Sequence, residues 1–190
     1  MYVRPHTLFQ RFMAGLDAEP ESSAVQSAAK SPKLGDFLAE LDLDMSLDWS
    51  GQSFQGLPAL RENILQRTGT GAFCGVDDVL ITAGAAEANF LTISQLVQPG
   101  DEMIVDVPGW PQPLVLGEAI GATVTPLPRD EASDWRFDMD QLAATVSDKT
   151  KLIFICNPNN PTGQLMTESE LTELVAIAER VGAYVLCDEV

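Results

Sequence analysis

The chain has 190 residues, of which 45% are hydrophobic and 21% are charged, so it can bury a substantial core. Its 28 acidic and 11 basic residues give a formal charge of −17, which would repel nucleic-acid phosphates and anionic membrane surfaces. No apolar run comes close to the length of a membrane span, which is about 18 residues, and residues 1–11 lack a signal-peptide pattern. We therefore expect a cytoplasmic protein with neither nucleic-acid nor membrane partners.

The cysteines, Cys74, Cys156 and Cys187, are odd in number and show no CxxC spacing. The sequence therefore predicts neither a disulfide framework nor a metal site. Cys156 and Cys187 lie in apolar, strand-like runs, so we interpret both as inert core thiols, with a redox role as the alternative.

Residues 17–36 are small and polar and include two prolines, which is typical of a flexible arm or linker. We expect an arm and linker over residues 1–50 and one domain over residues 51–190. In that domain, short β-branched runs alternate with helical patterns. The runs are residues 79–82, 103–107, 124–127, 152–156 and 184–187. This alternation predicts an α/β fold of parallel βαβ units, with helices on both faces of the sheet.

Three helices are expected between these runs. Ala86, Phe90, Ile93 and Val97 repeat at helical spacing before the stop signal at residues 99–101. Thr167 and Glu170 form a capping-box pattern, followed by Leu171, Leu174, Val175 and Ala178 on one face and a stop at Gly182. Asp138 or Asp140 is expected to cap a shorter helix that continues through Val146.

Small residues at 82–87 (Thr-Ala-Gly-Ala-Ala-Glu) follow one strand-like run and open a helix. Small side chains let an anion approach the free N–H groups of a helix's first turn, so a phosphate site is one reading. The segment is not a GxGxxG motif, and a tight turn without a ligand is the other reading. Trp110, after Val107-Pro108-Gly109, is expected either to stack on a planar ligand or simply to pack.

The turn at residues 157–163 (Asn-Pro-Asn-Asn-Pro-Thr-Gly) is more specific. Its prolines force extended geometry on Asn157 and Asn160, so the amides are held in fixed directions, although many Asn-Pro turns only cap their own backbone. Asp188 follows an apolar run and is expected at the end of a buried strand. A carboxylate there requires a cationic partner or a proton, unless it serves as a helix cap or a surface ion pair.

Together these segments resemble class I/II aminotransferases, which are pyridoxal-phosphate enzymes of fold type I. The motifs stand in the family's order over about residues 43–190. They are residues 56–61 (GLPALR), 81–84 with 87–88, 99–102, 108–110, 157–163 and 188–190. The resemblance implies a three-layer αβα large domain with a mostly parallel sheet, present here only in part behind an N-terminal arm.

The resemblance also implies a role for each matching residue. Gly84, Ala85 and Ala86 would bind the cofactor phosphate through backbone N–H groups, and Trp110 would stack on the pyridine ring. Asn160 would hydrogen-bond the ring's phenolic oxygen, and Asp188 would pair with the ring nitrogen. Cis peptides are implied at Val107-Pro108 and Asn160-Pro161.

The lysine that forms the family's Schiff base follows the position of Asp188, and no lysine follows it here. The catalytic residues are therefore unknown, and we expect the 190-residue chain alone to be inactive and to fold poorly. The family's sheet also places two later strands beside residues 79–82, so this run should lack its neighbours.

The expected function is transfer of an amino group between an amino acid and a 2-oxo acid, with pyridoxal 5'-phosphate as cofactor and a homodimer at full length. Another reaction of the same fold is the alternative, namely that of a lyase, a decarboxylase or a cyclase. A short noncatalytic protein that binds the cofactor is a further alternative.

Overall fold

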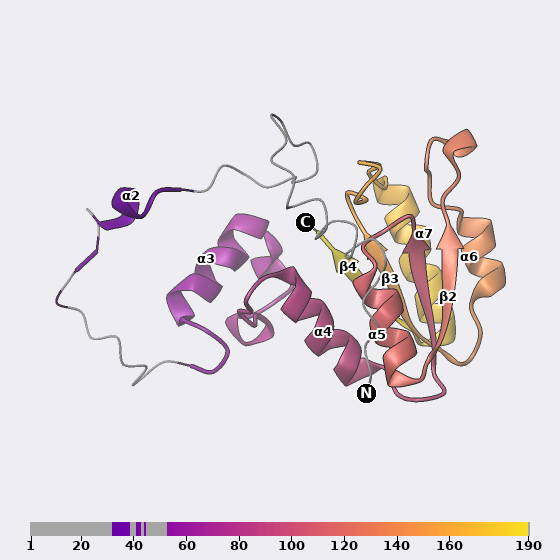
Figure 1. Ribbon diagram of the computed structural model, residues 1–190, viewed down its shortest axis with the longest axis horizontal. Helices are drawn as coiled ribbons and strands as arrows, with labels where there is room; N and C mark the ends of the chain where they lie inside the picture. The colour runs from indigo at the N-terminus through magenta and orange to yellow at the C-terminus, as the bar shows by residue number, and fades with distance from the viewer. Residues whose placement is uncertain (1–31, 39–40, 43, 45–52, 190) are drawn as a thin grey trace, which may run out of the picture. The chain divides into compact units, whose positions relative to one another are not determined.

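The computed structural model describes residues 32–38, 41–42, 44 and 53–189 (Figure 1). Contacts divide the chain into two units, with the boundary between Ile81 and Thr82. None of the helices in the described part combines the length and the hydrophobicity that a bilayer crossing requires.

The unit that begins at Thr82 is built on a parallel sheet (Figure 1). Its strands are β1 (Glu102–Val107), β2 (Thr123–Pro128), β3 (Thr150–Cys156) and β4 (Tyr184–Asp188), in the order β2-β1-β3-β4. Its helices are α4 (Ala85–Leu96), α5 (Gln112–Ile120), the 3-10 turn η3 (Glu131–Ser133), α6 (Met139–Thr145) and α7 (Glu168–Val181). All pairings are parallel, which confirms the predicted α/β class.

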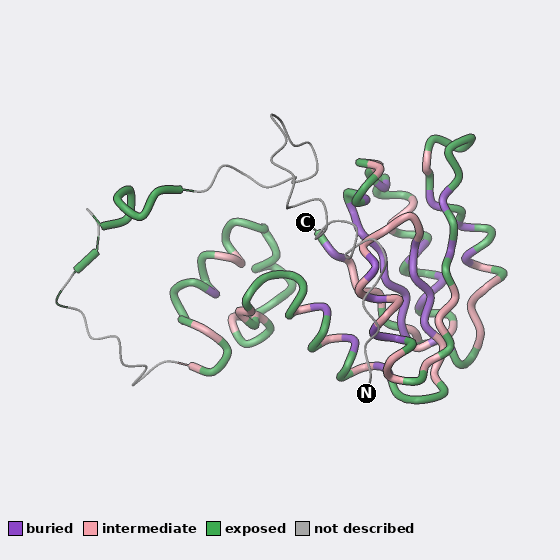
Figure 2. The backbone as a smooth tube through the Cα atoms, in the orientation of Figure 1, coloured by how far each residue is buried: buried purple, intermediate pink, exposed green. Residues whose placement is uncertain are grey.

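Alternate residues of the central strands point to opposite faces and fill two separate cores. Ile104, Ile153 and Ile155 pack with residues of α6 and α7, whereas Met103, Val105 and Phe154 pack with residues of α4 and α5. Helices therefore cover both faces of the sheet, and the purple strands in Figure 2 lie between them. This arrangement confirms the three layers.

Helix α5 approaches the sheet closely because Gly117 has no side chain. A Cβ built at Gly117 would lie 2.5 Å from Val124 Cγ2 and 3.1 Å from Met103 Sδ. The helix ends at Gly121, whose φ of 96° lies in the left-handed region that glycine favours.

Helix α4 has the expected extent, but its buried face was predicted only in part. Ile93 and Val97 are buried, whereas Phe90 is 41% exposed and Ala86 is also exposed. Asn89, one position before Phe90, is 3% exposed and takes the inward position instead. The spacing of apolar residues had suggested Phe90 as part of the buried face. It did not indicate that a polar residue would take that position.

The caps of α6 and α7 agree with the sequence. Asp138 caps α6 by accepting a hydrogen bond from the Gln141 backbone N–H, and the capping box of Thr167 and Glu170 opens α7. The buried face of α7 also differs slightly from the expected one, since Val175 is 47% exposed and Ile177 is buried.

Residues 79–82 form no strand, so that strand prediction was wrong. Val79 has extended dihedral angles, yet none of the strands found in the described residues pairs with it. A β-branched run becomes a strand only where a neighbouring strand supplies hydrogen bonds.

The unit that ends at Ile81 contains short helices. They are α2 (Leu34–Leu38), α3 (Pro58–Thr68), η1 (Thr70–Ala72) and η2 (Val76–Asp78). Arg61 of α3 is buried and donates to Gln55 Oε1 at 3.0 Å and to the Val76 carbonyl at 2.9 Å. Within the predicted arm over residues 1–50, the structure describes only residues 32–38, which include α2, and residues 41–42 and 44.

Candidate functional site

Strands β1, β3 and β4 all end at one edge of the sheet, because parallel strands direct their carboxyl ends the same way. Such an edge is the usual position of ligand sites in open α/β sheets. There β1 leads into Pro108-Gly109-Trp110, β3 leads into the turn at residues 157–163, and β4 ends at Asp188, which pairs in register with Cys156.

Asp188 is 5% exposed, as predicted for an acid at the end of a buried strand. Its Oδ2 accepts a hydrogen bond from Asn89 Nδ2 at 2.8 Å, and its backbone carbonyl accepts one from the Asn157 N–H at 3.0 Å. The carboxylate is thereby connected to α4, and its backbone to the turn after β3. Among the described residues, no ion pair neutralises it.

The N-terminus of α4 offers an open, uncapped helix end. Gly84 precedes it with φ of 90° and makes no side-chain cap, and a Cβ built there would have no atom within 4 Å. The backbone N–H groups of a first turn have no partner within the helix. Glu87 Oε2 accepts from the Ala83 N–H at 2.5 Å, so the groups left for a ligand are those of Gly84, Ala85 and Ala86.

Trp110 is half-buried and is connected to this helix end through Gln112. The indole Nε1–H donates to Gln112 Oε1 at 3.3 Å, and Gln112 Nε2 donates to the Ala86 carbonyl at 2.7 Å. Two of the predicted cofactor residues, Trp110 and Ala86, therefore lie on either side of one glutamine side chain.

The turn at residues 157–163 is held from within by Asn159. Asn159 Oδ1 accepts from the Thr162 hydroxyl at 2.7 Å, and the Asn159 carbonyl accepts from the Gly163 N–H at 2.7 Å. Asn160 is exposed, and its side chain makes no hydrogen bond within the described part of the chain. Cis peptides occur at Val107-Pro108 and Asn160-Pro161, as the resemblance implied, and also at Asn157-Pro158.

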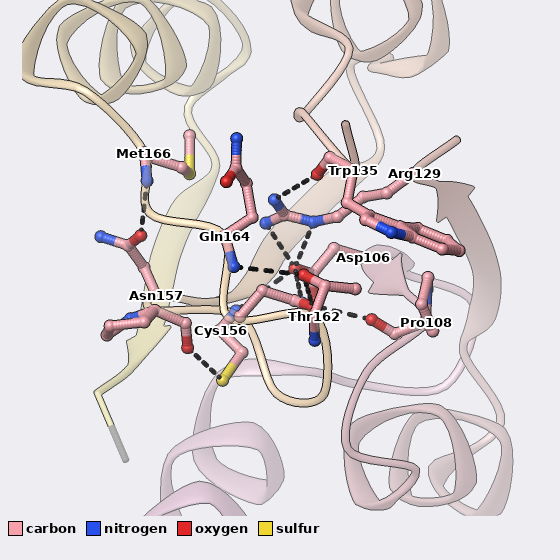
Figure 3. A network of polar contacts seen from close by, with 11 residues as sticks. Asp106, Pro108, Arg129, Trp135, Cys156, Asn157, Thr162, Gln164 and Met166 are labelled. Atoms are coloured by element: carbon pink, nitrogen blue, oxygen red, sulfur yellow. Dashed lines mark hydrogen bonds and ion pairs between the residues drawn. The ribbon is translucent and has the colours of Figure 1, made fainter. Parts of the chain in front are cut away.

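A buried ion pair connects Asp106 of β1 to Arg129, the residue directly after β2 (Figure 3). Arg129 Nη2 lies 2.9 Å from Asp106 Oδ2, and both side chains are 1% exposed. The same oxygen accepts from Asn159 Nδ2 at 3.3 Å, and Asn159 Nδ2 also lies 3.2 Å from the Pro108 carbonyl. Arg129 Nη1 donates to the Trp135 carbonyl at 3.2 Å.

Burial raises the pKa of Asp106, and Arg129 and the hydrogen bonds from Cys156 and Asn159 oppose that shift. Asp106 Oδ1 has no hydrogen-bond partner, so the carboxylate makes all its contacts through Oδ2. A Cβ at Gly109 would lie 2.7 Å from the Asp106 carbonyl, so the turn after β1 packs directly on this residue.

The two cysteines near the strand ends agree with the prediction of core thiols. Cys156 is buried and its thiol donates to the Pro158 carbonyl at 3.2 Å. Burial raises the pKa of Cys156, and burial together with the charge of Glu189 raises the pKa of Cys187 to about 11. Cys74 is exposed.

Hydrogen bonds through Gln112 therefore join Trp110 to Ala86 at the start of α4. A separate hydrogen bond joins Asp188 to the same helix. Asn160 joins only through the backbone of its turn. Sequence reasoning missed Asn89, Asp106, Gln112 and Arg129. The available signal was a polar residue inside an apolar pattern, as for Asp106 within Met103–Val107 and Asn89 within α4. An open hollow of ≈ 440 Å³ is lined by residues of the segment 128–141, Arg129 among them, and by none of the predicted cofactor-binding residues.

Comparison with known proteins agrees with this geometry. A family profile described as "Aminotransferase class I and II" matches residues 20–190. The chain belongs to this family. Among curated relatives, an aspartate aminotransferase from Musicola paradisiaca is 32% identical over 62% of this chain and 29% of its own length. The glutamate-pyruvate aminotransferase AlaA of Haemophilus influenzae is 33% identical over 72% of this chain and 34% of its own length.

Solved structures give the same result for this aminotransferase-family chain. A PLP-dependent aminotransferase from Streptococcus suis superposes with a TM-score of 0.73 at 36% identity, covering 82% of this chain and 40% of that one. An alanine aminotransferase from Pyrococcus furiosus gives a TM-score of 0.68 at 32% identity, covering 82% and 38%. The chain thus spans about a third of the length of the curated relatives described above.

Proposed function

We propose that the protein is a pyridoxal-phosphate-dependent aminotransferase, and that this chain supplies most of the cofactor-binding surface. The observation that carries the proposal is the buried, unneutralised carboxylate of Asp188, at the same sheet edge as the uncapped end of α4. Family membership and the PLP-dependent relative from Streptococcus suis support it.

The residues present fit pyridoxal phosphate by the chemistry of their polar groups. The cofactor carries a phosphate, a ring nitrogen that binds a proton and a phenolic oxygen. The chain offers backbone N–H groups at Gly84, Ala85 and Ala86 for an anion, the Asp188 carboxylate for a protonated nitrogen and the exposed Asn160 amide for an oxygen. Trp110 presents a half-buried aromatic ring beside the helix end.

In the proposed mechanism Asp188 would hold a proton on the ring nitrogen, since a carboxylate with no other cationic partner among the described residues would favour the protonated form of that nitrogen. Bound pyridoxal phosphate supplies an electron sink for the pair left on a substrate's α-carbon when that carbon loses a proton. The α4 end, Trp110 and Asn160 orient the group, and the low exposure of Asp188 excludes water from the pairing.

The substrates in this proposal are an amino acid and a 2-oxo acid, as in amino-acid metabolism. We also propose a cytoplasmic homodimer at full length. The names of the relatives include aspartate, tyrosine and glutamate-pyruvate aminotransferases, so the sequence comparisons favour no single amino donor.

The test is a transaminase assay on the protein at the length that its gene encodes, with pyridoxal phosphate and a panel of amino acids paired with 2-oxoglutarate or pyruvate. We expect 2-oxo acid and amino acid products in equal amounts. Ammonia, carbon dioxide or a cyclised product instead would indicate a lyase, a decarboxylase or a cyclase, and binding without turnover would indicate a noncatalytic protein.

Asp188→Ala is the critical variant. Turnover should fall by roughly 100-fold or more, a size typical of removing one group that stabilises developing charge. Binding of inorganic phosphate, measured by isothermal titration, should change little because the α4 end is intact. The control is Asp101→Ala, which removes a carboxylate just before the amino end of β1, away from the edge where the strands end, and it should retain turnover. Unchanged turnover in Asp188→Ala would remove this residue from the mechanism.

A further inference from the structure

Asn89 is a polar residue on the buried face of α4. It is 3% exposed, and its helix neighbours Ile93 and Val97 are among the core residues of that face. Asparagine is a poor helix former, and an amide that is buried without a hydrogen-bond partner destabilises the fold. A leucine would fit an apolar core position better on both counts, so the amide needs a specific partner to be tolerated here.

That partner is the carboxylate of Asp188, 99 residues later in the chain. Asn89 Nδ2 donates to Oδ2 at 2.8 Å. Among the described residues, this is the one side-chain hydrogen bond found for the Asp188 carboxylate, and it is made to Oδ2. The bond therefore fixes the rotation of the carboxylate about its Cβ–Cγ bond while one oxygen stays free.

An amide is suited to this task because it is neutral. A lysine or arginine at position 89 would orient the carboxylate but also neutralise it, and would compete with any cationic ligand group. The charges that act on the neighbouring thiols of Cys156 and Cys187 are the carboxylates of Asp106, Asp188 and Glu189 and the guanidinium of Arg129. Arg129 is the cation in this set and is paired with Asp106, and no ion pair among the described residues includes Asp188.

We propose that Asn89 is a positioning residue for the cofactor. It holds Asp188 so that Oδ1 faces the protonated ring nitrogen of pyridoxal phosphate. It also connects this carboxylate to α4, whose first turn would hold the phosphate of the same molecule. This inference rests on the proposed function and adds to it a residue outside the motifs shared with the family.

The test measures apparent Kd values by equilibrium dialysis for two ligands, using the protein at its natural length. The ligands are pyridoxal phosphate and its analogue with CH in place of the ring nitrogen, which keeps the phosphate and the aldehyde. Asn89→Leu and Asn89→Ala both remove the donor, but one enlarges and the other shrinks the side chain. Gln95→Leu removes an exposed amide from the same helix and is the matched control.

We expect both Asn89 variants to bind pyridoxal phosphate roughly tenfold more weakly, the size of losing one hydrogen bond to a charged group. The affinity of both variants for the ring-carbon analogue should equal that of the wild type, because the analogue has no ring N–H that could donate a hydrogen bond to Asp188. Gln95→Leu should match the wild type for both ligands. Agreement between the larger and the smaller replacement would exclude packing as the cause.

Two results would overturn the inference alone: unchanged affinity for pyridoxal phosphate in both Asn89 variants, or an equal loss for both ligands, which would indicate a purely structural role. If the wild type itself does not prefer pyridoxal phosphate to the analogue, the pairing of Asp188 with the ring nitrogen fails, and with it both this inference and that part of the proposed function.

Discussion

At the scale of residues, one carboxylate oxygen of Asp106 accepts hydrogen bonds that join β1 to the turn after β3 and to the segment after β2. Desolvating two charges is costly, and the pair with Arg129 offsets that cost only while both partners are present. Their contact at 2.9 Å makes each side chain a condition for the burial of the other, and Asp106 also accepts a hydrogen bond from Asn159 in the turn after β3.

Removing one member of this pair should therefore destabilise the protein strongly. Arg129→Met leaves Asp106 buried without its cation, at a cost of about 3–5 kcal/mol in the free energy of unfolding. The double variant Asp106→Leu with Arg129→Met should lose clearly less than the sum of the single losses. Urea unfolding of the wild type, of the single variants Asp106→Leu and Arg129→Met, and of the double variant measures these losses. Additive losses would show that the two charges do not interact.

At the scale of elements, the first turn of α7 is capped by its own side chains, and Arg136 adds one contact from another segment. Thr167 Oγ1 accepts from the Glu170 N–H at 3.3 Å, and Glu170 Oε2 accepts from the Thr167 N–H at 2.7 Å. Thr167→Ala should lower the free energy of unfolding by about 1 kcal/mol, the usual cost of losing an N-cap. Thr172→Ala, an exposed exchange within the same helix, is the control, and an equal effect of both would contradict a capping role.

The same box predicts a pH dependence. Hydrogen bonds from Thr167 lower the pKa of Glu170 below its ordinary value of 4.5, and Arg136 adds to the shift. A lowered pKa means that the unfolded chain binds more protons in this range, so the contribution of Glu170 is present above about pH 4.5 and is lost as the pH falls through the folded pKa. The stability difference between wild type and Glu170→Gln, followed by thermal unfolding from pH 6 to pH 3, should shrink toward acid pH. A constant difference would contradict this assignment.

These elements also show what the sequence could and could not predict. Caps and strand runs rest on residues within a few positions of one another, and the capping box, Asp138 and the strands β1 to β4 were predicted correctly. Residues 79–82 were predicted wrongly because pairing needs a partner strand, which no local pattern reports.

The positions of Gly84 before a helix and of Asp188 at the end of a buried strand followed from their motifs, whereas the cofactor roles of Gly84, Trp110 and Asp188 stay predictions. The site was not predictable where contacts join distant residues. Asn89 meets Asp188 across 99 positions and Arg129 meets Asp106 across 23, and only the position of a polar residue in an apolar run could have drawn attention to either pair.

At the scale of the whole molecule, the described units differ in how much they bury. The unit that begins at Thr82 has two cores around a central sheet, whereas Arg61 is the one buried residue of α3. We expect the sheet unit to dominate the cooperative unfolding transition, because apolar burial supplies most of the stabilisation.

The three cysteines have a consequence for experiments on this protein. Cys74 is exposed, whereas Cys156 is buried and the pKa of Cys187 is raised to about 11, so their thiolates form rarely while the sheet is intact. Thiol reagents at pH 8 should modify Cys74 first, the half-buried Cys187 more slowly because of its raised pKa, and the buried Cys156 only as fast as the sheet opens. Mass spectrometry of the labelled peptides over time would then report local opening at β3 and β4 without any introduced probe. Equal labelling rates at all three positions would contradict the burial of the strand ends.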